Sequence, residues 1–215
     1  MGKTNFFYLL SALLFLLFAI PLAHDLEIPA APVRAVVFSV LLLVGVWSLK
    51  GGGRFFAIGM ILAIVGVILN VLAMQLNSTL FHFNSLLLLI GFLLVTISFT
   101  LRQVVFGTEI NANRLVGAIC VFLLLGVIWA LAYSLLELVV PLSFAGVAPI
   151  RGPGWDNGWL YFSFVTLTTL GYGDITPVSA TARSLAYLQA VVGQFYVAVL
   201  VAGLVSAYIS DKQGS

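Results

Sequence analysis

The stretch TTLGYGD, residues 168–174, lies between two apolar segments of very different length. The segment before it, Asp156 to Thr168, is amphiphilic and too short to cross a bilayer, whereas the segment after it, Ala180 to Ile209, is long enough. Gly171 and Gly173 indicate a backbone that leaves ordinary strand geometry, because glycine adopts positive φ without steric cost. The pattern predicts a short helix and an irregular loop held between membrane-spanning helices.

The composition of the whole chain supports a membrane setting. Of 215 residues, 62% are apolar and 7% are charged, whereas about 25% of the residues of a soluble domain are charged. These values exclude a soluble globular protein, and the long unbroken apolar runs disfavour a porin-like barrel. The net charge of +2 is too small to indicate a nucleic-acid partner. The partner that the composition predicts is the lipid bilayer.

Six segments are apolar enough to cross about 30 Å of hydrocarbon. Pro29 and Pro32 are expected to break the chain before the second segment, and a tight turn is expected at 50–54, which reads Lys-Gly-Gly-Gly-Arg. A phosphate loop is not favoured at this turn, because no strand precedes it and no Gly-Lys-Ser/Thr follows. The six predicted spans are Phe6–Ala23, Val33–Leu49, Phe55–Leu76, Ser85–Leu101, Leu115–Val140 and Ala180–Ile209.

The basic residues set the predicted orientation in the cell membrane, because Lys and Arg concentrate on the cytoplasmic side. With both termini cytoplasmic, the inner side carries six basic and two acidic residues, and the outer side carries three basic and five acidic residues. Lys3 followed by an apolar run and Pro21-Leu22-Ala23 also resembles a secretory signal peptide. A retained first helix is preferred, because Pro21 suits a cleavage site poorly.

The residues quoted at the outset carry a family resemblance. TTLGYGD is similar to the selectivity filter of potassium channels, usually written TTVGYGD, and Leu115–Ile209 resembles their pore module of outer helix, pore helix, filter and inner helix. The resemblance covers about 95 of the 215 residues. It implies an all-α membrane protein, with a four-helix domain at 1–110 and a pore domain at 111–215. It also implies a passive potassium-selective channel that works as a homotetramer, with K⁺ as the permeant ligand and no other cofactor.

The implied ion site consists of neutral oxygens. A ring of backbone carbonyls can replace the hydration shell of a cation without a fixed charge that would trap it. By the resemblance, these carbonyls belong to Thr169, Leu170, Gly171 and Tyr172, the Thr169 hydroxyl closes the innermost site, and Gly173 completes the strip. Tyr172 is expected to point away from the axis, against the pore helix. Thr168 and Asp174 flank the filter as supporting residues.

The short helix before the filter is expected to contribute an electrostatic term. Asp156 or Asn157 can cap its N-terminus. Its C-terminus, near Thr168, would then point at a central cavity, where the negative end of the helix dipole favours a cation.

Several positions depart from the usual family pattern. Leu170 replaces Val in the filter, and Val165 stands where some relatives have a glutamate behind it. Tyr161 and Phe162 stand where the family often has two tryptophans. We expect the Tyr161 hydroxyl to bond Asp174 and brace the outer end of the filter.

The last segment contains the predicted gating residues. Gly193 lies twenty residues after Gly173, where the family has a hinge glycine; a close helix contact is the alternative reading. Val197 and Val201 share its helical face and are expected to line the cavity, where an apolar constriction can gate by dewetting. A polar residue at Val201 is therefore expected to raise the resting current.

Other polar residues receive structural interpretations. Glu137, an acid within a span, is expected to tie the outer helix to backbone donors near the filter rather than to bind ions. Cys120 reads as a buried small hydrophobe, and His24 and His82 read as incidental residues of outer loops. Ser85–Leu101 contains no Arg or Lys, so steep voltage dependence is not expected.

Other function classes remain as alternatives. A weakly selective cation channel has the same architecture, and a non-conducting accessory subunit would share the sequence pattern. A secondary transporter would show internal repeats, of which the sequence has none. The sequence also lacks HExxH, a nucleophile elbow and paired intramembrane acids, which disfavours an enzyme.

Overall fold

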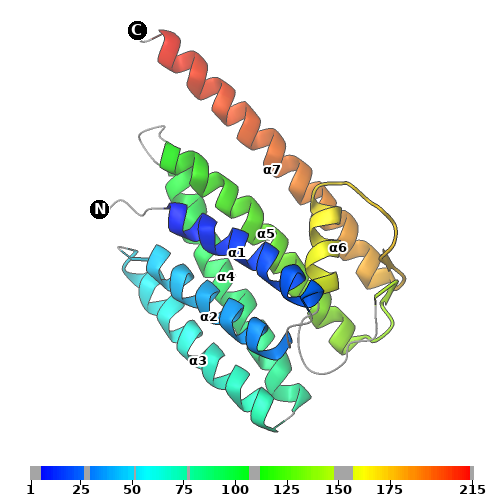
Figure 1. Cartoon of the computed structure of the whole chain (residues 1–215). Helices are drawn as coiled ribbons and strands as arrows, with labels where there is room; N and C mark the ends of the chain where they lie inside the picture. The colour runs from blue at the N-terminus through cyan, green and yellow to red at the C-terminus, as the bar shows by residue number, and fades with distance from the viewer. Residues whose placement is uncertain are drawn as a thin grey trace.

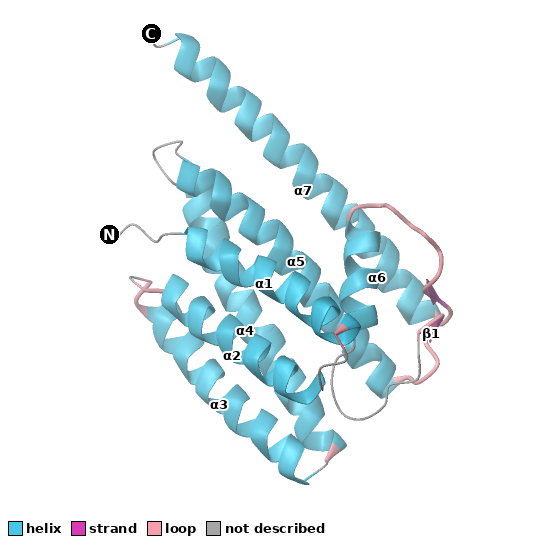
Figure 2. Ribbon diagram, in the orientation of Figure 1, coloured by secondary structure: helices cyan, strands magenta, loops and turns pink. Residues whose placement is uncertain are grey.

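The computed structural model is mainly helical in the part that it describes, residues 6–26, 30–50, 52–76, 78–106, 112–147 and 157–213 (Figures 1 and 2). Two short strands pair antiparallel, with Phe144 opposite Pro177 and Ala145 opposite Thr176. The helices are α1 (Phe6–Asp25), α2 (Ala30–Ser48), α3 (Arg54–Leu76), α4 (Thr79–Phe106), α5 (Ala112–Val139), α6 (Asn157–Leu167) and α7 (Ala180–Gln213), and the strands are β1 (Phe144–Ala145) and β2 (Thr176–Pro177).

Each predicted apolar segment corresponds to one of these helices, and the short segment before the filter is α6, as predicted. Within the described residues, four helices are long and apolar enough to cross a membrane, namely α1, α3, α4 and α5. The glycine-rich stretch between α2 and α3 forms the expected turn, in which the Gly52 amide donates to the Leu49 carbonyl. The described part is therefore mostly helical, with several helices that could span a membrane.

Two sequence predictions about helix ends are wrong. Pro32 lies inside the first turn of α2 rather than before it, because a proline there has no amide that needs a partner. His82 lies in α4 and His24 lies in α1, so neither belongs to an outer loop. The cause is common to both: bilayer thickness limits the apolar run, but the helix continues beyond it until a residue breaks it.

The first half of the chain packs directly against α5, the first helix of the second half, through α1 and α4. Helices α1 and α4 both lie along α5 (Figure 1). Gly117 on α5 allows this closeness, because a Cβ there would lie 2.9 Å from the Phe6 ring. One continuous apolar cluster of buried side chains runs from α1 to α6. The four-helix domain and the pore domain expected from sequence thus share a packed interface.

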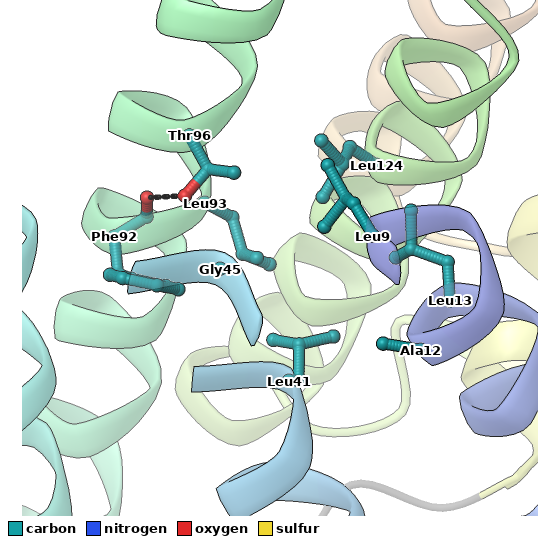
Figure 3. A pocket seen from close by; sticks show the side chains of 9 residues that line it. All are labelled: Leu9, Ala12, Leu13, Leu41, Gly45, Phe92, Leu93, Thr96 and Leu124. Carbon is teal, nitrogen blue, oxygen red and sulfur yellow. Dashed lines mark hydrogen bonds between the residues drawn. The ribbon is translucent and has the colours of Figure 1, made fainter. Parts of the chain in front are cut away.

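A narrow apolar gap lies among α1, α2, α4 and α5 (Figure 3). Its lining includes one hydroxyl, that of Thr96, which donates to the Phe92 carbonyl of its own helix at 3.0 Å. The remaining lining is apolar or glycine, so the gap offers no polar group to a ligand. The lining residues are Leu9, Ala12, Leu13, Leu41, Gly45, Phe92, Leu93, Thr96 and Leu124.

Candidate functional site

Helix α6 supports the stretch at 168–174 and is itself almost surrounded by protein. Trp159, Ser163 and Leu167 are fully buried. The helix ends where Thr168 donates its hydroxyl to the Phe164 carbonyl at 2.7 Å and Thr169 adopts a φ of 58°. The capping residue Asp156 and the side chain of Asn157 lie outside the described part, so the expected N-cap stays a prediction.

The backbone after α6 alternates in conformation. Thr169, Gly171 and Gly173 have φ of 58°, 61° and 80°. Positive φ is inexpensive for the two glycines but costs of order 1–3 kcal/mol for an ordinary residue. Sequence reasoning placed positive φ at the glycines and missed it at Thr169, because a β-branched residue rarely adopts it.

The amides of this stretch turn back toward α6. The amides of Leu170 and Gly171 both donate to the Val165 carbonyl, at 2.9 and 3.4 Å. In a planar trans peptide the carbonyl points opposite to the N–H. The carbonyls of Thr169 and Leu170 therefore point away from α6, on one common side of the chain. Val165, where some relatives carry a glutamate, contributes this acceptor with its backbone.

The side chains of the stretch are exposed in the single chain. Leu170 is 55% and Tyr172 is 67% exposed. The Tyr172 ring lies parallel to the Tyr161 ring of α6, with 6.4 Å between centroids. Tyr172 thus lies over α6, on the side opposite to the Thr169 and Leu170 carbonyls.

Asp174 anchors the outer end of the stretch. Its carboxylate accepts the Tyr161 hydroxyl at 2.7 Å and the Ile175 amide at 3.0 Å. The hydrogen bond from Tyr161 holds the pKa of Asp174 below its usual range. Gly146, which directly follows β1, contacts the same residue: its φ is 82°, and a Cβ there would collide with the Asp174 carbonyl oxygen. Sequence reasoning missed Gly146, because no local pattern shows what it approaches.

Glu137 holds the loop that follows α5. Its two carboxylate oxygens accept the amides of Leu142 at 2.8 Å and Ser143 at 3.0 Å. The Ser143 carbonyl accepts the Ser179 amide, and the Ser179 hydroxyl accepts the Ala182 amide in the first turn of α7. The carboxylate therefore bonds backbone donors, the arrangement expected for a structural acid. Through Ser143 and Ser179 it links the outer ends of α5 and α7.

Gly193 lies where α7 passes the C-terminus of α6. A Cβ at this position would lie 2.4 Å from the Leu167 carbonyl oxygen, so the approach needs a glycine. Helix α7 runs unbroken through Gly193. This geometry supports the close-contact reading, and the hinge reading stays a prediction. Val197 is 42% exposed in the single chain, and the side chain of Val201 lies outside the described part.

Sequence reasoning missed a buried polar cluster that joins α5, α6 and α7. Tyr133 of α5, Ser163 of α6 and Gln189 of α7 are each fully buried and bond one another. Between the same helices α5 and α7, farther from α6, the Tyr196 hydroxyl donates to the Ala118 carbonyl at 2.6 Å. The available signal was Gln189, an amide that interrupts an apolar run.

The described residues contain no group of three or more His, Cys, Asp or Glu side chains that could hold a metal ion. The oxygens that this stretch offers are the carbonyls of Thr169 and Leu170, which point away from α6, and the Thr169 hydroxyl. The Gln194 amide lies 3.5 Å from that hydroxyl. Oxygen atoms of this kind suit a hard, weakly held cation.

Comparison with known proteins identifies relatives of this half of the chain. Residues 117–210 match the family described as "Ion channel". The chain is 43% identical over 56 residues to "Two-pore potassium channel 3" of Arabidopsis thaliana, and 44% identical over 54 residues to "Two pore potassium channel c" of Oryza sativa subsp. japonica. These matches cover 26% and 25% of this chain, but only 13% and 12% of the relatives. No solved structure matches significantly. The second half of the chain is therefore similar to an ion-channel domain and, over about a quarter of the chain, to potassium channels, of which it spans only a small part.

Proposed function

We propose that this chain forms a passive, potassium-selective channel through the TTLGYGD stretch. The observation that carries the proposal is the backbone at 169–171, in which the amides of Leu170 and Gly171 bond back to the Val165 carbonyl. The carbonyls of Thr169 and Leu170 are thereby turned to one free side. The matches to potassium channels support potassium as the ion.

The proposed mechanism is replacement of water by neutral oxygens. Carbonyls of Thr169, Leu170, Gly171 and Tyr172 would coordinate the dehydrated ion at successive levels, and the Thr169 hydroxyl would close the innermost one. Five residues span at most about 17 Å, which is enough for several ions in single file. Repulsion between neighbouring ions then offsets binding, so that ions leave quickly.

The working unit is proposed to be a homotetramer. One chain supplies one strip of carbonyls, and a ring around an ion needs several strips related by symmetry. The exposure of Leu170 and Tyr172 in the single chain supports this assembly, because neighbouring copies would cover them. Four α6 C-termini would then point toward one axis, where their dipoles favour a cation in the cavity.

The remaining helices complete the proposed architecture. Six helices, α1 to α5 and α7, would span the cell membrane with both termini cytoplasmic. The burial of Leu9, Leu13 and Leu16 of α1 in the common core supports a retained first helix. Between Thr79 and Leu101, α4 contains no Arg or Lys, which supports a channel without steep voltage dependence.

The test is potassium flux from liposomes that contain the purified protein. We expect flux that barium blocks and that Gly171→Ala abolishes, because alanine at a φ of 61° distorts the carbonyl strip. Gly91→Ala in α4 is the matched control, because a Cβ there meets nothing within 4 Å and the backbone is helical. Barium-insensitive flux would contradict the proposal. Absence of flux at every pH and voltage would also contradict it, and would favour a non-conducting accessory subunit.

A further inference from the structure

The buried cluster behind the filter joins three helices through side chains. The Tyr133 hydroxyl donates to Gln189 Oε1 at 2.5 Å. Gln189 Nε2 donates to the Ser163 carbonyl at 2.9 Å and to Ser163 Oγ at 2.8 Å. Ser163 Oγ in turn donates to the Gly126 carbonyl at 2.6 Å. The chain of bonds therefore starts on α5, crosses α7 and α6, and returns to α5.

The donor and the acceptor of each hydrogen bond in this cluster can be assigned. The carbonyls of Ser163 and Gly126 can only accept, which fixes the orientation of the Gln189 amide and of the Ser163 hydroxyl. Both N–H groups of the amide are used, and its oxygen accepts from Tyr133. Tyr133, Ser163 and Gln189 are each 0% exposed, so an unpaired member would have no water to replace its partner.

An aromatic cover closes the outer side of the cluster. Phe144 of β1 lies 5.4 Å from the Tyr133 ring and 5.4 Å from the Phe162 ring, both in edge-to-face arrangement. Trp159 packs on Phe144 at 4.9 Å. These rings exclude water, and a dry setting strengthens the bonds and makes their loss expensive.

The cluster is in register with the close contact at Gly193. Gln189 and Gly193 are four residues apart on α7, and their partners Ser163 and Leu167 are four residues apart on α6. One face of α7 therefore holds one face of α6 at two successive turns, once by hydrogen bonds and once by a backbone contact. Two residues beyond Leu167, the proposed filter begins.

We propose that Gln189 is a positioning residue of the filter, which ties the inner helix to the pore helix so that movement of α7 changes the carbonyl strip. The inference rests on the proposed function, since it concerns the same strip. A shift of α7 along or around α6 would break the Gln189 bonds before the helices separate. In the intact cluster, the strip keeps its conducting shape.

The consequence is measurable through the concentration of potassium. Potassium ions bind the carbonyl strip in its conducting conformation and not in a distorted one. By mass action, a high potassium concentration therefore favours the conducting conformation even when the Gln189 bonds are missing. A loosened strip should therefore need more potassium for the same flux. A defect of folding or assembly alone would lower the maximal flux without changing that concentration.

The test uses the full chain in liposomes and a variant that removes the cluster without leaving a polar group unpaired. Tyr133→Phe, Ser163→Ala and Gln189→Met combined keep the side-chain volumes and leave no buried orphan, so thermal stability should stay near that of the unmodified chain. We expect half-maximal flux at a potassium concentration about fivefold higher. Thr100→Val is the matched control, because its buried hydroxyl bonds only its own helix.

The outcomes separate this inference from the proposed function. Absence of potassium flux in the unmodified chain contradicts the proposed function itself. The role of Gln189 is overturned if the unmodified chain conducts and a stably assembled triple variant shows the same dependence of flux on potassium concentration. If the triple variant does not assemble, Ser163→Ala alone decides, because it removes one of the two bonds of the amide. Its half-saturating concentration should rise, and an unchanged value overturns the inference.

Discussion

The two halves of the molecule use their buried hydroxyls differently. In the first half, the hydroxyls of Ser48, Thr96 and Thr100 donate to carbonyls of their own helices. In the second half, Tyr133 and Tyr196 donate from one helix to another. Apolar packing tolerates repacking, whereas an interhelical bond in a dry site specifies one geometry. The contrast indicates that the relative positions of the helices are specified most exactly around residues 168–174.

Among the substitutions that test this contrast, Gly193→Ala is expected to have the largest effect on flux. The new Cβ would lie 2.4 Å from the Leu167 carbonyl oxygen, a backbone atom that cannot move without displacing α6. We expect potassium flux to fall by more than about tenfold, which corresponds to about 1.4 kcal/mol. Gly203→Ala on the same helix is the control, since nothing lies within 4 Å of its Cβ. Equal flux in the two variants would refute the close-contact reading.

Glu137→Gln should have the next largest effect. The carboxylate accepts two amides, and a glutamine can accept with its oxygen but presents an N–H group to the other amide. Loss of one charge-assisted bond costs about 1.5–3 kcal/mol. The check is the thermal unfolding midpoint of the purified protein, which should fall. An unchanged midpoint would mean that the outer ends of α5 and α7 do not depend on this carboxylate.

Tyr161→Phe should have a smaller effect that depends on pH. The Tyr161 bond lowers the folded-state pKa of Asp174, so it adds stability above the usual carboxyl pKa, and this is lost as pH falls through the folded-state value. Without the hydroxyl, the pKa of Asp174 rises, and flux should begin to fail at a higher external pH. The measurement is flux against external pH for both proteins. Coinciding acid limbs would argue against the brace.

The smallest effect is expected in the first half. Thr96→Val removes a hydroxyl that bonds only the Phe92 carbonyl, in a gap whose other lining is apolar or glycine (Figure 3). We expect a change in the free energy of unfolding within about 0.5 kcal/mol and unaltered flux. A loss of flux comparable to that of Gly193→Ala would erase the difference between the halves.

Hydropathy predicted the helices well because bilayer thickness imposes one length on every span. Hydropathy could not predict that α4 begins at Thr79, because it detects the apolar run and not the residues before Ser85, none of which breaks the helix. The filter was readable because Gly171 and Gly173 are local signals for positive φ. Gly146 and Tyr133 were not readable, because their roles depend on contacts with residues 28 and 56 positions away in the chain.

Selectivity of a single pore tests the central claim most directly. The purified chain would be placed in a planar bilayer with equal concentrations of potassium on one side and sodium on the other. The account predicts a reversal potential displaced strongly in the direction that only potassium permeation can produce, and lost current in Gly171→Ala. A reversal potential near zero would contradict a carbonyl-lined potassium filter and show a weakly selective cation pore.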